Sequence, residues 1–296
     1  MSFSTSFAAR LTVVAAITAA LTGGLTPSWA DSPAGSSVDR ADLSARPADL
    51  DFYVAGLEAL APGDVWAVGY QKSADRQWST RAAHWDGSAW TIVPTPSPAH
   101  GPGTYLAAVS GTGSDDVWAV GRYWNGEGHS PDRLLIEHWD GSTWSVVPSA
   151  KPRGVGNHHV TRYLSGVSAT SPNDVWAVGY ASGQGAVAEH WDGEAWTFAK
   201  LPTVSRTLID ISASSGADVW AVGQGERSRA AAMRFDGTDW EAHGLPHIPN
   251  VITQLYGVAA LASDDVWAVG EYFRTDDGTG GALLEHWDGN RWQRIP

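Results

Sequence analysis

The 296-residue sequence contains no cysteine, so no disulfide can stabilise its fold, and chemistry that needs a cysteine is excluded. Basic residues are also scarce, with 19 Lys and Arg against 32 Asp and Glu, which gives a formal net charge of −13. An acidic surface repels nucleic-acid backbones and anionic membranes. We therefore expect neutral or cationic partners and no nucleic acid.

Long apolar runs are almost absent. The longest covers residues 11–25 and is shorter than the roughly 20 residues that a membrane-spanning helix needs. Arg10 precedes this run, and Ser28, Trp29 and Ala30 follow it as a small-x-small cleavage site. We predict a signal peptide over 1–30, a flexible leader over 31–50 rich in Ser, Ala, Asp and Pro, and a secreted chain without membrane insertion.

Tryptophan, in contrast, is abundant and follows a repeat. The hexapeptide Asp-Val-Trp-Ala-Val-Gly occurs five times, beginning at Asp64, Asp116, Asp174, Asp218 and Asp265. A second motif, His-Trp-Asp-Gly, follows at His84, His138, His190 and His286, with the variant Arg-Phe-Asp-Gly at Arg234. A further Trp comes three residues after each of these glycines, so the repeated positions hold 14 of the 17 Trp. Such a repeat indicates a modular fold.

Each repeat predicts four short strands in about 50 residues, which is typical of a β-propeller blade. The hexapeptide strand is apolar on both faces, as expected where sheets are stacked on both sides. The Asp-Gly pair between the last two strands predicts a tight hairpin turn. We expect an all-β, five-bladed β-propeller over 51–296 with four antiparallel strands per blade and a closed ring whose two ends meet. The predicted blades are 51–98, 99–153, 154–202, 203–246 and 247–296.

The glycine after the hexapeptide strand, the aromatic-Asp turn and the following Trp resemble the kelch and galactose-oxidase superfamily of β-propellers. Kelch blades carry a Gly-Gly pair where this chain has single glycines such as Gly69 and Gly121. The Trp-Asp pairs are similar to those of WD40 repeats, and Asp-Gly-x-x-Trp is similar to a shortened sialidase Asp-box. All three resemblances imply the same architecture. The copper site of galactose oxidase needs a cysteine, so that activity is excluded.

The loops between the second and third predicted strands vary in length and chemistry, whereas the other turns are nearly identical. Variation within a repeat points to function, and exposed aromatic rings suit sugars or peptide side chains. The alternative is that these rings only pack over blade edges. The candidate ligand-binding residues are Tyr70, Trp78, Tyr123, Trp124, Tyr180, Tyr272 and Phe273.

The recurring histidines could in principle form a metal site, but radial symmetry spreads them around the propeller, and Arg234 replaces the fourth. A repeated hydrogen bond to a neighbouring strand is the better interpretation. Glu137, Glu189 and Glu285 also recur and are interpreted as structural. A weak metal or anion site is conceivable at His158 and His159, near Lys151 and Arg153. We predict no catalytic residues, no metal and no cofactor.

The leading hypothesis is a secreted binding module that presents variable loops to an extracellular carbohydrate or protein. A glycoside hydrolase or sialidase-like enzyme is an alternative, but it requires unique carboxylates in an acid–base arrangement. The scattered candidates are Glu58, Glu127, Asp132, Glu226, Asp276 and Asp277. A structural or oligomerising propeller is a third hypothesis. None of these carboxylates sits in a recognisable acid–base or nucleophile signature, so the sequence leans against an enzyme. It leaves the oligomeric state open.

Overall fold

A computed structural model describes residues 51–98, 103–124, 132–150, 161–203 and 205–296 of the chain. The predicted signal peptide and leader lie outside these residues, as do Glu127, Lys151, Arg153, His158 and His159. Apart from the short 3-10 helix η1 (Glu226–Ser228), the regular structure in the described part is all β. No helix there has the length and apolar character that a bilayer crossing requires.

Five four-stranded sheets follow one another along the chain. The first contains β1 (Tyr53–Ala61), β2 (Asp64–Lys72), β3 (Trp78–Trp85) and β4 (Trp90–Val93). The second contains β5 (Tyr105–Gly113), β6 (Asp116–Tyr123), β7 (Arg133–Trp139) and β8 (Trp144–Val146). The third contains β9 (Arg162–Ser171), β10 (Asp174–Ala181), β11 (Gly185–Trp191) and β12 (Trp196–Phe198). The fourth contains β13 (Ser205–Ser215), β14 (Asp218–Gly225), β15 (Ala230–Phe235) and β16 (Trp240–His243). The fifth contains β17 (Val251–Ala262), β18 (Asp265–Arg274), β19 (Gly280–Trp287) and β20 (Trp292–Arg294).

Within each sheet the strands pair with their neighbours in chain order, all antiparallel, which confirms the all-β prediction and the four-stranded antiparallel sheets. The last two strands are joined by the predicted Asp-Gly turn. In the first sheet, Gly87 has φ +94°, and the Asp86 carboxylate accepts hydrogen bonds from the backbone N–H of Ser88 and Ala89 at 2.8 and 2.9 Å. The turn therefore needs both the carboxylate and a residue that tolerates positive φ.

The glycine that ends the hexapeptide has a steric cause. A Cβ atom built on Gly69 would lie 1.9 Å from the carbonyl oxygen of Tyr53 on the first strand, and the four equivalent glycines meet the same obstacle at 1.9–2.2 Å. In every repeat the backbone of the first strand lies this close to the glycine of the second strand, so a residue with a side chain does not fit there. The single glycine thus fixes how β1 and β2, and their counterparts, pair.

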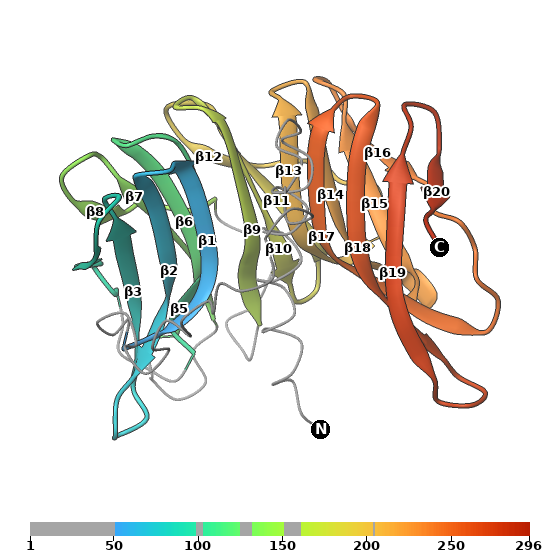
Figure 1. Cartoon of the computed structure of the whole chain (residues 1–296), viewed down its shortest axis with the longest axis horizontal. Coiled ribbons are helices and arrows are strands. Elements are labelled where there is room, and N and C mark those ends of the chain that lie inside the picture. Colours follow the sequence, from blue (N-terminus) through green and yellow to red (C-terminus); the bar gives the residue numbers. More distant parts are fainter. Residues whose placement is uncertain (1–50, 99–102, 125–131, 151–160, 204) are drawn as a thin grey trace, which may run out of the picture.

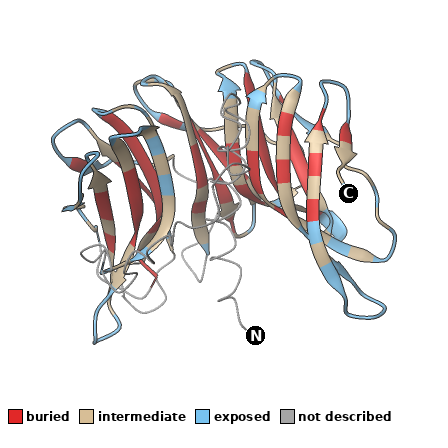
Figure 2. Cartoon of the chain, viewed as in Figure 1, coloured by how far each residue is buried: buried red, intermediate tan, exposed pale blue. Residues whose placement is uncertain are grey.

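Consecutive sheets pack through a repeated aromatic contact. The tryptophan of each of the first four hexapeptides inserts between two aromatic rings of the next sheet. The ring centroid of Trp66 lies 5.0 Å from that of Trp139 and 5.3 Å from that of Trp144. The same arrangement joins the second and third, third and fourth, and fourth and fifth sheets. Four apolar clusters, one at each interface, make up the core, and buried positions concentrate on the middle strands (Figure 2).

The predicted closed five-bladed ring is wrong. Figure 1 shows the five sheets along an open arc, with the first sheet (blue) and the last (red) at opposite ends. None of the core clusters formed by the described residues joins the fifth sheet to the first. Leu57 of the first sheet is accordingly 45% exposed, whereas its counterpart Val109 in the second sheet is 6% exposed. The repeat specifies how one sheet packs on the next. Because the arc is open, the fifth sheet does not pack on the first in this way in the described part of the chain.

Candidate functional site

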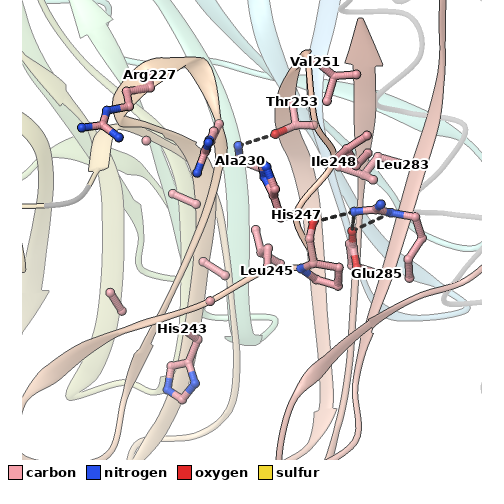
Figure 3. Close-up of a pocket in the computed structure, with 18 of the residues that line it drawn as sticks. Arg227, Ala230, His243, Leu245, His247, Ile248, Val251, Thr253, Leu283 and Glu285 are labelled. Carbon is pink, nitrogen blue, oxygen red and sulfur yellow. Dashed lines mark hydrogen bonds and ion pairs between the residues drawn. The ribbon is translucent and has the colours of Figure 1, made fainter. Parts of the chain in front are cut away.

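A cleft of about 540 Å³ lies between the fourth and fifth sheets (Figure 3). Its volume falls within the range of about 300–1,000 Å³ that is usual for small-molecule sites. One side is formed by η1 and the start of β15, and another by the connection from β16 to β17, which includes Leu245, Pro246 and His247. Side chains of β17, β19 and β20 complete it.

The fourth repeat departs from the others where it borders this cleft. Its loop after the hexapeptide strand is the 3-10 turn η1, in which Arg227 and Ser228 have φ of +55° and +56°. The backbone N–H of Gly225 donates to the carbonyl oxygen of Arg229 at 2.6 Å and closes the turn. Non-glycine residues rarely adopt positive φ, and such conformations persist only where the surroundings hold them. The turn leaves Arg229 exposed at the rim of the cleft.

A charged pair forms the polar wall of the cleft. The Arg294 guanidinium donates to the Glu285 carboxylate through Nε at 3.1 Å and Nη2 at 2.6 Å, and Nη2 also donates to the carbonyl oxygen of Pro246 at 2.8 Å. Burial raises the pKa of Glu285, and the hydrogen bonds and positive charge of Arg294 partly oppose this shift. The Glu285 side chain is only 1% exposed and holds the guanidinium in place, whereas Arg294 is 32% exposed and offers hydrogen-bond donors at the cleft.

Apolar side chains cover the remaining wall, with Leu245, Ile248, Val251 and Leu283 around the cleft. Thr253 Oγ1 accepts a hydrogen bond from the backbone N–H of Ala230 at 2.7 Å, which ties the fifth sheet to the fourth (Figure 3). A cleft with one apolar wall and a few convergent polar groups is suited to a small ligand that carries both hydroxyl groups and an apolar face.

Two of the predicted aromatic residues come together at the rim of the first two sheets. The rings of Tyr70 and Trp78 stack with centroids 4.5 Å apart and an interplanar angle of 9°, and Tyr53 stacks on Tyr70 at 5.0 Å. Tyr105 lies 6.0 Å from Tyr70. The sequence analysis missed Tyr53 and Tyr105 because they belong to the first strands. The signal that could have revealed them is an aromatic residue at the start of the first strand of a repeat, where antiparallel pairing places it opposite the end of the hexapeptide strand.

The other predicted aromatic residues belong to the second, third and fifth sheets and do not join this cluster. Tyr123 packs against the core between the first two sheets, and the Trp124 backbone N–H donates to Thr104. The ring of Tyr180 lies 5.8 Å from that of Tyr163. Tyr272 and Phe273 end β18, where Phe273 is 47% exposed. None of the seven predicted residues lines the cleft.

The recurring histidines bind aspartates of the hexapeptide strand. In each of four sheets the histidine Nε2 lies 2.7–2.8 Å from the carboxylate that opens the hexapeptide: His84 and Asp64, His138 and Asp116, His190 and Asp174, and His286 and Asp265. In the fourth sheet, Arg234 Nε donates to Asp218 at 2.6 Å and takes the same role. Among the described residues, no group of three or more potential ligands could hold a metal ion.

The recurring glutamates are buried at the interfaces between sheets. Glu189 accepts hydrogen bonds from Ser149 Oγ and from the backbone N–H of Ala150, both at 2.9 Å, which ties the third sheet to the second. Burial raises the pKa of Glu137 to about 8, and neither of its carboxylate oxygens has a hydrogen-bond partner among the described residues. These contacts agree with the structural interpretation.

The non-repeated carboxylates do not assemble into an acid–base pair in the described chain. Burial raises the pKa of Glu58 to about 7, on the strand β1. Asp132 pairs with Arg122 at 3.0 Å, and Asp277 accepts hydrogen bonds from Thr279 in an exposed turn. Glu226, on η1, is the one of them that reaches the cleft.

No protein-family model and no curated protein matches the chain. Solved structures do. A variant of the lectin from Aleuria aurantia, in complex with Fucα1-6GlcNAc, matches with a TM-score of 0.51 and 15% identity over 80% of this chain and 75% of that chain. A second structure of this lectin, described as a six-bladed β-propeller, matches with a TM-score of 0.53 and 12% identity over 83% and 78%. YCF48 from Cyanidioschyzon merolae is also similar, with a TM-score of 0.44 and 13% identity over 83% and 85%.

The similarity to the lectin places the chain among β-propeller folds and completes the correction of the blade count. The lectin has six blades, and this chain, with five sheets, covers 78% of it, close to five blades of six. The expected five-bladed ring is therefore replaced by five sheets of a propeller with a different blade number. The specific resemblance to kelch and galactose oxidase is not reproduced in these matches.

Proposed function

We propose that the chain is a secreted carbohydrate-binding module, without enzymatic activity, that holds its ligand in the cleft between the fourth and fifth sheets. The observation that carries this proposal is the pairing of a fixed Arg294–Glu285 wall with an apolar wall around one cleft. Sugars present hydroxyl groups to a fixed cation such as Arg294 and an apolar C–H face to partly exposed side chains such as Leu245 and Ile248. The fucose-binding lectins with the same fold support it. Secretion rests on the predicted signal peptide.

The carboxylates of the described residues form no recognisable catalytic arrangement, which favours binding over hydrolysis. Glycosidases need two carboxyl groups on either side of the scissile bond, one of them free to transfer a proton. In the cleft, Glu285 is held in an ion pair with Arg294, and Glu226 lies on the exposed turn η1. Their positions favour a module that recognises a sugar and leaves it intact.

A glycan-array screen of the mature chain from Asp31 onward, with and without a divalent-metal chelator, tests the proposal. We expect saturable binding to one glycan family that resists the chelator. Arg229→Ala and His247→Ala should weaken binding at least about tenfold, because both exposed side chains line the cleft. Arg274→Ala, a change at an exposed arginine outside the cleft, is the matched control and should bind normally.

The loop aromatics provide the competing location for the ligand. If Trp124→Ala and Tyr272→Ala abolish binding while the cleft variants retain it, the sugar site lies on the loops and the cleft proposal is wrong. If no glycan binds in either buffer, carbohydrate recognition is contradicted and a protein partner replaces it.

A further inference from the structure

The outward-facing surfaces at the two ends of the arc correspond to the two sides of the interface that joins each pair of consecutive sheets. On the fifth sheet, Trp267, Val269 and Leu284 occupy the positions that enter the next sheet. Their counterparts in the fourth sheet, Trp220, Val222 and Ala232, are buried, with exposed fractions of 0%, 0% and 2%. Trp267, Val269 and Leu284 are all only partly buried. We call these three residues the last face.

On the first sheet, Leu57, Trp85 and Trp90 occupy the positions that receive the tryptophan of a preceding sheet, and we call them the first face. Trp90 is partly exposed, whereas its four counterparts Trp144, Trp196, Trp240 and Trp292 are all buried. In the described structure, the ring contacts of Trp85 and Trp90 are with each other. The first face therefore lacks a tryptophan from outside, and the last face lacks the two rings that would enclose Trp267.

Among the described residues, no ring contact and no core cluster joins the two faces. A serine hydrogen bond that accompanies three of the internal interfaces also has no equivalent at the fifth sheet. In the second, third and fourth sheets a serine hydroxyl accepts a hydrogen bond from the backbone of the next sheet, as Ser212 Oγ does from the N–H of Ala260 at 3.0 Å. The equivalent position in the fifth sheet is Ala259, which has no hydroxyl group.

We propose that the first and last faces together form a docking site for one further four-stranded blade of the same repeat, supplied by another polypeptide segment. The four internal interfaces define what this blade must present. It needs an aromatic pair, equivalent to Trp287 and Trp292, around Trp267, and a hexapeptide tryptophan between Trp85 and Trp90. It also needs a polar group near Arg81, which replaces on the first face the apolar residue found there in the other sheets, such as Leu135.

A covalent version of the docking can be built by appending a second copy of residues 247–296 after Pro296. We expect the six-repeat chain to be monomeric, to melt at a higher temperature than the five-repeat chain, and to show less acrylamide quenching of tryptophan fluorescence, because the appended blade covers both faces. Trp267→Ala in the six-repeat chain should remove most of the gain. Val146→Ala, at an exposed apolar residue of the second sheet and away from both faces, should leave it intact.

A second variant tests the first face in the same six-repeat chain. Trp90→Ala should also remove most of the gain in melting temperature, because it deletes one of the two rings that would enclose the incoming tryptophan. Failure of the six-repeat chain to melt at a higher temperature than the five-repeat chain would overturn the proposal. It would equally be overturned if sedimentation shows that the five-repeat chain pairs with a second copy through these faces.

Discussion

The interface between the fourth and fifth sheets and the last face of the fifth sheet are built from the same repeat but differ in what covers them. Trp220 is enclosed by Trp287 and Trp292, at ring-centroid distances of 5.0 and 5.2 Å, and is fully buried. Trp267 has the same neighbours in sequence, and its Nε1 donates to Asp265 at 2.9 Å, yet it remains partly exposed. The repeat determines where the ring lies within its sheet, whereas the adjoining sheet determines how much the ring stabilises the fold.

Replacing the two tryptophans separately should give the largest difference. Trp220→Ala is expected to lower the free energy of unfolding by about 3–5 kcal/mol, because it leaves a cavity between two sheets. Trp267→Ala should cost less than about 1.5 kcal/mol, since little apolar surface is lost from the core. Urea denaturation of the five-repeat chain measures both. Equal losses would show that the last face is covered in solution.

The pH dependence of stability distinguishes two internal interfaces. The pKa of Glu137 in the folded chain, about 8, lies above its value of 4.5 in the unfolded chain, so its neutral form contributes stability that is complete below about pH 4.5 and is lost as the pH rises through 8. The loss approaches about 1.4 kcal/mol per pH unit within this window. Glu137→Gln should flatten the fall between pH 5 and 8, measured by thermal denaturation at each pH.

Glu285 provides the contrast, because Arg294 lies beside it whereas no cationic partner is described for Glu137. Glu285→Gln should destabilise the protein at pH 7, since it leaves a partly buried guanidinium without its carboxylate. If both glutamine variants shift stability in the same direction at pH 8, the distinction between the two interfaces is wrong.

The hydrogen bond from the Ala260 backbone N–H to Ser212 Oγ, which links the fifth sheet to the fourth, should give the smallest effect. Ser212→Ala removes the acceptor for the Ala260 N–H and is expected to cost about 1–2 kcal/mol, because a partly buried donor loses its partner. The converse change at the open end, Ala259→Ser, should alter stability by less than about 0.5 kcal/mol, as no sheet lies beyond it to donate. A gain from Ala259→Ser in differential scanning calorimetry would indicate that a neighbouring backbone is present.

The local structure could be predicted from the sequence because the residues that determine each four-stranded sheet lie within a single repeat. The hexapeptide strand that is apolar on both faces, the Asp-Gly turn at Gly87 and the glycine at Gly69 act within one sheet. The structure contains the four antiparallel strands that were predicted. Ring closure was not predictable in this way, since the angle between consecutive sheets depends on how side chains such as Trp66 and Trp144 pack. The repeat count was taken as the blade number, and this step was wrong.

The candidate cleft also escaped sequence analysis. It depends on residues from five separate segments, including Arg294 at the end of the last strand and Glu285, which was interpreted only as a repeated structural residue. The aromatic loops were conspicuous because they break the repeat, but contacts such as that between Tyr70 and Tyr53 depend on strand pairing. The short turn η1 was visible only as a brief loop between two strands.

The distance between the two ends of the arc tests the central claim most directly. Because the chain has no cysteine, spin labels can be placed only where cysteines are introduced. One label pair is Gly63→Cys with Asp264→Cys, and double electron–electron resonance then measures the distance from the first sheet to the fifth. A Cβ atom at position 63 would meet its neighbours at ordinary contact distances, so the substitution is tolerated there. Ala217→Cys with Asp264→Cys, at equivalent turns of the fourth and fifth sheets, is the reference. A gap one blade wide predicts a distance of roughly 1.7 times the reference. Equal distances for the two pairs would mean that the five sheets close on themselves, and the account of two open, complementary faces would be contradicted.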